Sequence, residues 1–533
     1  MVDMVQASAG KPTGKNVVIF SDGTGQAGGF RFDENRSNIY KLYRATRCGP
    51  DSSVDPHEQI AFYDPGLGSQ ADGGHVFGRL LRWIHNTVAQ ATGFGITRNI
   101  IDCYAALIQL WQPGDRVFLI GFSRGAYTVR CLGGVIARCG IPTHPKNQPN
   151  GILKIDEGSA QKLAAYAVKH IYQFTYPRKT SDPDTTERHK FLLVTRAELA
   201  TRFRADYGAG DKTAPSKANV YPHFIGVFDT VAALGNPATS TVFSLAFLGF
   251  AAVLGLGGEL LRLFSDAPWI GWLFAYLTFA NVFLGLIVLA AISALCVYVF
   301  THLKWDFSVP GYNREQLLRT IHFNELWMKF YDCDLDANVG YARHAISIDE
   351  NRKNFQRVHW YSTKQTERDE NGIQWFEQVW FSGNHSDIGG SNSENESRLS
   401  DIALDWMLRW AAAVPQGLKY DQGVLQVWPY PEGPQHDEVA TGFAFIPRWT
   451  GITWGEEKRK LPGTAAIMHR SVYRRFDERA VQVYDSMTRY RPETLAIHVD
   501  FESYYEPGAA FPATSLATAT TVAGEPPDRA PTA

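Results

Sequence analysis

The sequence has few cysteines and no excess of charge of one sign. Its six cysteines are scattered over 533 residues, and none of them form a C-x-x-C pair. Such a scatter in a long chain argues against both a disulfide framework and a zinc cluster. The 52 basic and 54 acidic residues give a formal net charge of −2, which leaves no electrostatic footprint for nucleic acid. We therefore expect reduced thiols and no nucleic-acid partner.

Two further features are missing. Residues 1–16 contain no apolar run, so no secretory signal peptide is expected. The glycine-rich residues 21–29 are not followed by Gly-Lys-Ser or Gly-Lys-Thr, which excludes a Walker A phosphate loop. The composition is otherwise that of a globular protein, 45% hydrophobic and 20% charged. The length suits one large α/β domain with insertions, or about two or three separate domains.

The most informative motif is G-x-S-x-G at residues 121–125, with Ser123 at its centre. An apolar run at residues 116–120 predicts a buried strand before it, and residues 126–132 can continue as a helix. This is the context of a nucleophile elbow, in which the backbone N–H of the next residue, Arg124, points toward a developing oxyanion. The alternative is an ordinary strand–turn–helix junction whose serine caps the helix.

An earlier apolar strand, expected at residues 16–20, runs into the glycine-rich loop. In serine hydrolases of this architecture, the second oxyanion donor comes from a loop after an early strand. Gly23 or Thr24 is our candidate for that donor, and Asp22 is a candidate supporting residue. The alternative is a flexible turn without a catalytic role. A helix expected at residues 96–111, followed by the elbow strand and its helix, indicates a mostly parallel α/β sheet with helices on both faces.

Two later strands end at residues that could complete a catalytic triad. Residues 222–228 predict a buried strand that ends at Asp229, and residues 378–381 predict one that leads to His385. In the α/β-hydrolase arrangement the acid and then the histidine follow the serine in the chain, so these two are our candidate acid and base. The alternatives are a helix N-cap for Asp229 and a polar turn residue for His385.

One acidic residue and one charged stretch each have more than one interpretation. Asp387 could orient His385 in place of Asp229, or it could bind a cation together with nearby oxygens. The charged end of residues 341–352 belongs either to a surface helix or to a salt-bridged support of the site, and we favour the support.

Two long uncharged stretches, residues 236–258 and 267–301, interrupt the chain. Each can supply the roughly 20 residues that a helix needs to span a bilayer. Because the chain on both sides must contribute to one site, we expect an even number of crossings or a re-entrant hairpin. The alternative is a hydrophobic hairpin buried inside the protein. The expected organisation is therefore a disordered start (1–15), a first catalytic part (16–235), the hydrophobic insertion (236–303), a second catalytic part with a cap-like end (304–506) and a disordered tail (507–533).

Several blocks of the sequence together resemble one family. They are FSDGTG from residue 20, YDPG from residue 63, GFSRGA from residue 121, GVFDTV from residue 226, HAISIDE from residue 344 and WFSGNHSDIGG from residue 380. This combination resembles the α/β-hydrolase-like domain that includes the phospholipase effectors of bacterial type VI secretion systems. The resemblance implies a serine lipase or esterase with Ser123, Asp229 and His385 as triad and glycerophospholipids as substrates. The hydrophobic insertion departs from a plain soluble effector.

The function expected from these observations is hydrolysis of lipid carboxylic esters through an acyl-enzyme, with no metal or cofactor required. Membrane lipids are the expected partners, and we expect a two-segment membrane-associated enzyme whose catalytic part lies on one side, the cytoplasmic one. The family resemblance also raises a secretion adaptor or an immunity protein as a partner, but the sequence contains no adaptor motif. Two alternatives remain: an esterase of small non-lipid esters, and a catalytically inactive membrane-associated scaffold.

Overall fold

The computed structural model describes residues 14–23, 35–66, 94–176, 185–231, 237–263, 278–323, 333–439, 455–506 and 519–525, apart from positions 152, 154, 155, 363 and 365, and it also describes residue 516. Its centre is a six-stranded sheet in the order β2-β1-β3-β4-β7-β8, and every neighbouring pair is parallel. The strands are β1 (Asn16–Ser21), β2 (Gln59–Asp64), β3 (Arg116–Phe122), β4 (Pro222–Phe228), β7 (Tyr341–Ser347) and β8 (Phe376–Phe381). The predicted α/β fold is confirmed.

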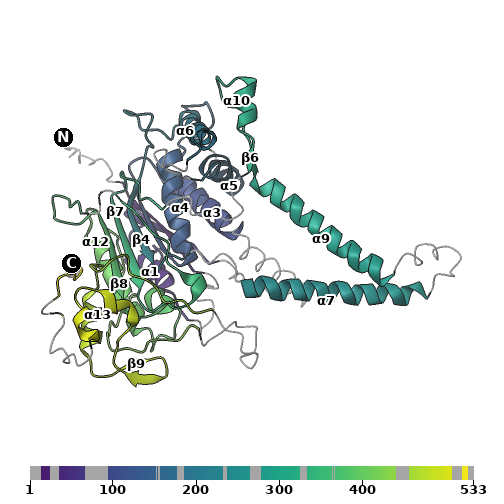
Figure 1. The fold of residues 1–533 in the computed structure, drawn as a ribbon. Coiled ribbons are helices and arrows are strands. Elements are labelled where there is room, and N and C mark those ends of the chain that lie inside the picture. The colour runs from purple at the N-terminus through teal and green to yellow at the C-terminus, as the bar shows by residue number, and fades with distance from the viewer. Residues whose placement is uncertain are drawn as a thin grey trace, which may run out of the picture.

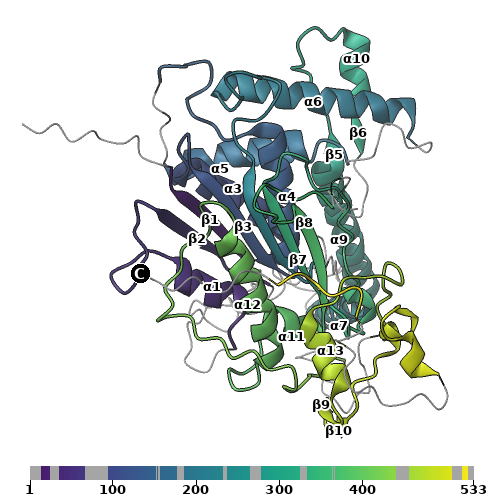
Figure 2. The same ribbon diagram turned by 90° about the vertical axis from the view of Figure 1, so that its left-hand side faces the viewer.

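Helices cover both faces of this sheet (Figure 2). In β1, Val17 and Ile19 belong to one hydrophobic core while Val18 and Phe20 belong to the other, because successive side chains of a strand point to opposite faces. The first core is covered by α3 (Phe94–Leu110), α4 (Arg124–Cys139) and α6 (Glu187–Tyr207), and the second by α1 (Asn38–Thr46) and α12 (Arg398–Ala413). Burial on both faces explains why most of these strands read as continuous apolar runs.

Two long helices project away from the body of the protein, at an angle to each other and close together at the end far from the body (Figure 1). They are α7 (Pro237–Arg262) and α9 (Phe279–His302), which pack against each other. Leucine side chains of both remain largely exposed, among them Leu256 at 63% and Leu289 at 61%. Within the described residues, one segment, Phe279–Phe300, is long and apolar enough to cross a membrane, and none of it is buried inside the protein. We call α7 and α9 together the apolar hairpin.

The chain after α12 packs onto the carboxyl ends of β7 and β8. Met468 and Tyr473 form a third hydrophobic core with Ile346 of β7 and Trp380 of β8. Thr521 and Ala523, within the tail expected to be disordered, exchange backbone hydrogen bonds with Met468. The elements of this region are α13 (Arg470–Asp477), β9 (Val481–Val483), β10 (Ser486–Thr488), η4 (Glu493–Ile497) and η5 (Glu502–Tyr505).

The remaining described elements are short or peripheral to the sheet. They are α5 (Glu157–Tyr166), η1 (Ala167–Tyr172), β5 (Leu303–Lys304), α10 (Arg314–Arg319), β6 (His322–Phe323), η2 (Lys353–Phe355) and α11 (His385–Gly389). Strand β5 pairs with β6 in a separate antiparallel ribbon where the chain returns from α9.

Candidate active site

The three candidate triad residues lie at one edge of the sheet. Ser123 follows β3, Asp229 follows β4 and His385 opens α11 just after β8. Because all six strands are parallel, their carboxyl ends meet at this edge, which is where α/β sheets bind ligands. The sheet order places β3 next to β4 and separates β4 from β8 by β7 alone. Residues distant in the sequence are thereby brought to one place.

Ser123 stands on a sharply turned backbone between β3 and α4. Its φ is 59° and its ψ is −121°, a conformation that non-glycine residues rarely adopt. The N–H of Ser123 donates to the carbonyl oxygen of Phe228 at 3.1 Å. A Cβ added at Gly125 would collide with the carbonyl oxygen of Ser21, and one at Gly121 would press on the backbone of Gly125. The two glycines of the motif therefore let the strand and the helix approach closely around the serine.

Asp229 and His385 are joined by a hydrogen bond. The Nδ1 of His385 lies 2.5 Å from the Oδ2 of Asp229, and both side chains are almost completely buried. Burial alone would raise the pKa of the Asp229 carboxyl, but the charge of Arg459 and the hydrogen bond from His385 hold that pKa well below its usual range. A charged carboxylate at Nδ1 keeps the proton on that nitrogen and leaves Nε2 free to accept one.

The imidazole of His385 lies between two phenylalanine rings. Its centroid is 4.6 Å from that of Phe122, the residue before Ser123, and 5.4 Å from that of Phe355. The Nε2 atom is buried and, among the described residues, has no hydrogen-bond partner, so it makes no hydrogen bond to Ser123. Hydrogen bonds between base and nucleophile are often long before substrate binds. A buried imidazole nitrogen without a partner among the described residues is suited to taking a proton.

The candidate oxyanion loop lies directly against the nucleophile. A Cβ at Gly23 would stand 3.0 Å from the Phe122 ring and 3.4 Å from the Cβ of Ser123. In this state the N–H of Gly23 donates to the Oδ1 of Asp22 at 2.7 Å. Asp22 is buried, and its Oδ2 accepts from Ser37 and Tyr63. Asp22 therefore holds the loop in position and engages the donor that we expected to face the oxyanion.

Arg124 and Thr24 are the other two candidate oxyanion donors. Arg124 opens α4, so its backbone N–H is one of the amides that the helix itself leaves without a partner. Thr24 lies outside the described residues.

Asp387 makes contacts away from the ring of His385. Its Oδ1 lies 2.6 Å from the Nδ1 of His436, and its Oδ2 accepts from the backbone of Asn384 at 3.1 Å. The second contact belongs to a capping box at the start of α11. Asp387 thus braces the short helix that carries His385, while Asp229 contacts the imidazole.

Two residues of the site had no place in the sequence-based triad. Arg459 forms two hydrogen bonds with Asp229, from Nη1 to Oδ1 at 2.5 Å and from Nη2 to Oδ2 at 2.9 Å. Glu350 accepts the backbone N–H of His385 at 3.2 Å and pairs with Arg352. Glu350 and Arg352 lie in the charged stretch that was expected to support the site. No pattern around Arg459 distinguished it from other basic residues.

A family model described as the T6SS phospholipase effector Tle1-like catalytic domain matches residues 15–253 and 306–410, which is more than half of the chain. The chain belongs to this family. The predicted family resemblance is thereby confirmed. Ser123, Asp229 and His385 all lie within the matched residues of the Tle1-like domain, whereas the whole of α9 and Arg459 lie outside them.

One curated relative and two solved structures are similar to this Tle1-like chain. The uncharacterized protein YEL023C of Saccharomyces cerevisiae is 25% identical over 474 residues, which cover 83% of this chain and 62% of the yeast protein. An uncharacterized protein from Pseudomonas aeruginosa has a TM-score of 0.31 at 14% identity, over 78% of this chain and 48% of that one. The Tle1 effector bound to the VgrG spike has a TM-score of 0.25 at 14% identity, over 72% and 52%.

Proposed function

We propose that this Tle1-like protein is a serine hydrolase that cleaves carboxylic ester bonds of glycerophospholipids through Ser123, His385 and Asp229. The observation that carries the proposal is the buried pair of His385 and Asp229 at the sheet edge where Ser123 stands on a strained elbow. Membership of a phospholipase effector family supports a lipid ester as the substrate. The free Nε2 of His385 supports its role as the general base.

The reaction proceeds by two acyl transfers. His385 takes the proton of Ser123 as its Oγ attacks the ester carbonyl, and Asp229 stabilises the imidazolium that forms. The backbone N–H of Arg124 and a donor from the loop of Gly23 and Thr24 hold the oxyanion. Gly23 can contribute only after its N–H leaves Asp22, so substrate binding is accompanied by a local rearrangement of this loop. His385 then protonates the leaving alcohol, and water releases the acyl group by the reverse sequence.

We also propose that the apolar hairpin enters the lipid and keeps the site at the membrane. Helix α7 begins a few residues after Asp229, so the hairpin arises from the edge of the sheet that carries the candidate triad. Strand β4 precedes the hairpin and β7 follows it in the same sheet. The catalytic body therefore lies on one side of the membrane, and the hairpin either crosses it twice or enters and returns.

The assignment of the nucleophile is tested by labelling with a fluorophosphonate. The full chain in detergent is expected to be labelled, and the Ser123→Ala variant is expected to lose both labelling and ester hydrolysis. Ser382→Ala is the matched control, because Ser382 is a buried serine just beyond β8 whose hydroxyl has no hydrogen-bond partner in the part of the chain that the structure describes. Hydrolysis that survives in a folded Ser123→Ala protein would overturn the proposal.

A further inference from the structure

We propose that Arg459 is a positioning residue of the triad, and that the segment carrying it belongs to the catalytic unit although the family match ends at residue 410. This inference rests on the proposed function of Ser123, Asp229 and His385. It assigns a role to part of the cap-like region after α12, whose purpose the sequence did not reveal.

The guanidinium of Arg459 is buried and hydrogen-bonded on both of its terminal nitrogens. Both of its terminal nitrogens donate to Asp229, one to each carboxylate oxygen. The same nitrogens also donate to the carbonyl oxygens of Ser347 at 3.2 Å and Phe355 at 2.6 Å. The side chain is buried, with 1% of its surface exposed. A planar guanidinium held at four acceptors fixes the plane of the Asp229 carboxylate, and with it the direction in which Oδ2 meets His385.

Backbone contacts hold the segment around Arg459 on the loop that follows β7 and on β8 itself. The N–H of Lys353 donates to Gly455 and that of Glu457 donates to Asn351, each at 2.7 Å. Further along, the N–H of Trp380 donates to Ile467 at 2.9 Å. These contacts lie on both sides of Arg459 in the chain. The position of the guanidinium is therefore set by the sheet edge itself.

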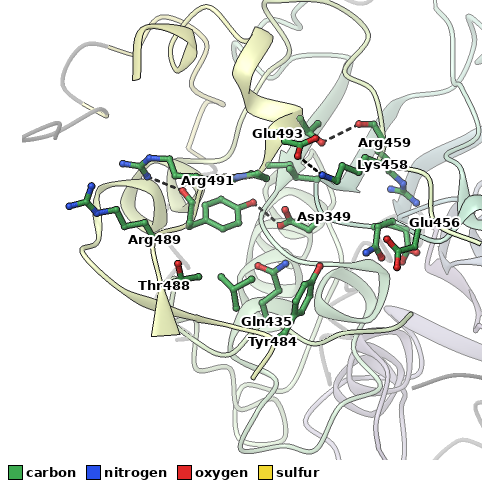
Figure 3. Close-up of a pocket in the computed structure, with 17 residues that line it drawn as sticks. Asp349, Gln435, Glu456, Lys458, Arg459, Tyr484, Thr488, Arg489, Arg491 and Glu493 are labelled. Atoms are coloured by element: carbon green, nitrogen blue, oxygen red, sulfur yellow. Dashed lines mark hydrogen bonds and ion pairs between the residues drawn. The ribbon is translucent and has the colours of Figure 1, made fainter. Parts of the chain in front are cut away.

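Figure 3 shows the pocket that lies beside Arg459. Arg459 and its neighbour Lys458 line a cavity of about 420 Å³ between the end of β7 and the C-terminal region. Lys458 pairs with Glu493 at 2.6 Å, and both of those side chains are mostly exposed. The two adjacent basic residues therefore differ in their acidic partner. Arg459 contacts Asp229 of the triad, whereas Lys458 contacts an acid at the surface.

The position of Arg459 has a consequence for proton transfer. Asp229 is shared between the imidazole and the guanidinium, so Arg459 offsets part of the negative charge that would otherwise stabilise a protonated His385. Other charged or titratable groups that act on this pair are His344, Glu350, Arg352 and Arg357. Because none of these others donates to Asp229, removing the guanidinium charge is expected to favour protonation of the base. The acidic limb of the pH–rate profile should then move to higher pH.

The experiment compares Arg459→Gln, Arg459→Lys and the control Lys458→Gln in the full-length protein in detergent. The measurement is kcat/KM for a soluble p-nitrophenyl ester between pH 5 and 9, together with fluorophosphonate labelling. In Arg459→Gln the acidic limb should move upward by on the order of one pH unit. In Arg459→Lys the limb should stay in place because the charge remains, while kcat falls about tenfold because the two-pronged contact is lost. In Lys458→Gln neither quantity should change.

An acidic limb of Arg459→Gln that coincides with the wild type would show that Arg459 serves folding alone, and the inference would be withdrawn. If Arg459→Gln does not fold, Arg459→Lys decides, since an unchanged kcat in that variant contradicts a positioning role. Failure of the proposed function is seen separately, as turnover that persists in Ser123→Ala.

Discussion

The apolar hairpin leads to a quantitative prediction about membrane binding. Leu284, Leu289 and Leu295 of α9 are each exposed by about 60%. Burying a whole leucine side chain in an apolar medium contributes roughly 1.5–3 kcal/mol, so three leucines at this exposure contribute roughly 3–5 kcal/mol on entering lipid. Replacing all three by serine should therefore weaken binding to vesicles by a factor of roughly 10²–10⁴.

The assay is flotation of the purified protein with vesicles of phosphatidylcholine and phosphatidylglycerol, scored beside hydrolysis of the vesicle lipids and of a soluble ester. The ratio of vesicle turnover to soluble-ester turnover should fall together with binding. A matched control replaces Val194, Leu318 and Ile497 by serine, because these residues of the body are also about half exposed. Equal flotation of the hairpin variant and the wild type would refute the role of the hairpin. Flotation lost equally in the control would show that any exposed apolar residue suffices.

Two further predictions concern the surroundings of the triad. Gly389→Ala places a Cβ in collision with ring atoms of Phe122, whose ring lies against the imidazole of His385. We therefore expect a loss of roughly 1–3 kcal/mol in the free energy of unfolding and a strong loss of labelling at Ser123. An unchanged melting temperature would contradict this. Burial lowers the pKa of His436, but Asp387 and Glu396 raise it overall. The stabilisation by His436 is therefore present below its ordinary pKa and disappears as the pH rises through the raised value, so His436→Gln should lower the melting temperature at pH 6 and much less at pH 9. Equal losses at both pH values would contradict the pairing.

Some strands of the sheet can be predicted from the local sequence pattern and others cannot. Strand β4 was predicted with the bounds that the structure has, Pro222–Phe228, because a strand buried on both faces is a continuous apolar run. Strand β7 was not predicted, although all of its residues are buried. It contains Arg343 and His344, which are fully buried. Arg343 lies over the ring of Trp410 and near Glu377, and contacts of this kind leave no trace in the spacing of residues.

The candidate site likewise contains residues that the sequence predicts and a contact that it does not predict. Ser123, Asp229 and His385 were predicted because each follows an apolar strand, and parallel strands bring their ends to one edge. Gly23 was predicted for its loop, but its present hydrogen bond to Asp22 could not be predicted, since it depends on the side chains that hold Asp22.

The sequence by itself determined the alternation of strands and helices, the elbow around Ser123 and the apolar character of the hairpin, because each of these depends on neighbouring residues. Only the tertiary structure decided that Asp229 meets both His385 and Arg459, residues 156 and 230 positions away. It also decided that the apolar segment Phe279–Phe300 of α9 stays uncovered by the body. The physical reason is that charge pairing and burial depend on distances in space, and these are set when the whole sheet and the segments packed on its edge come together.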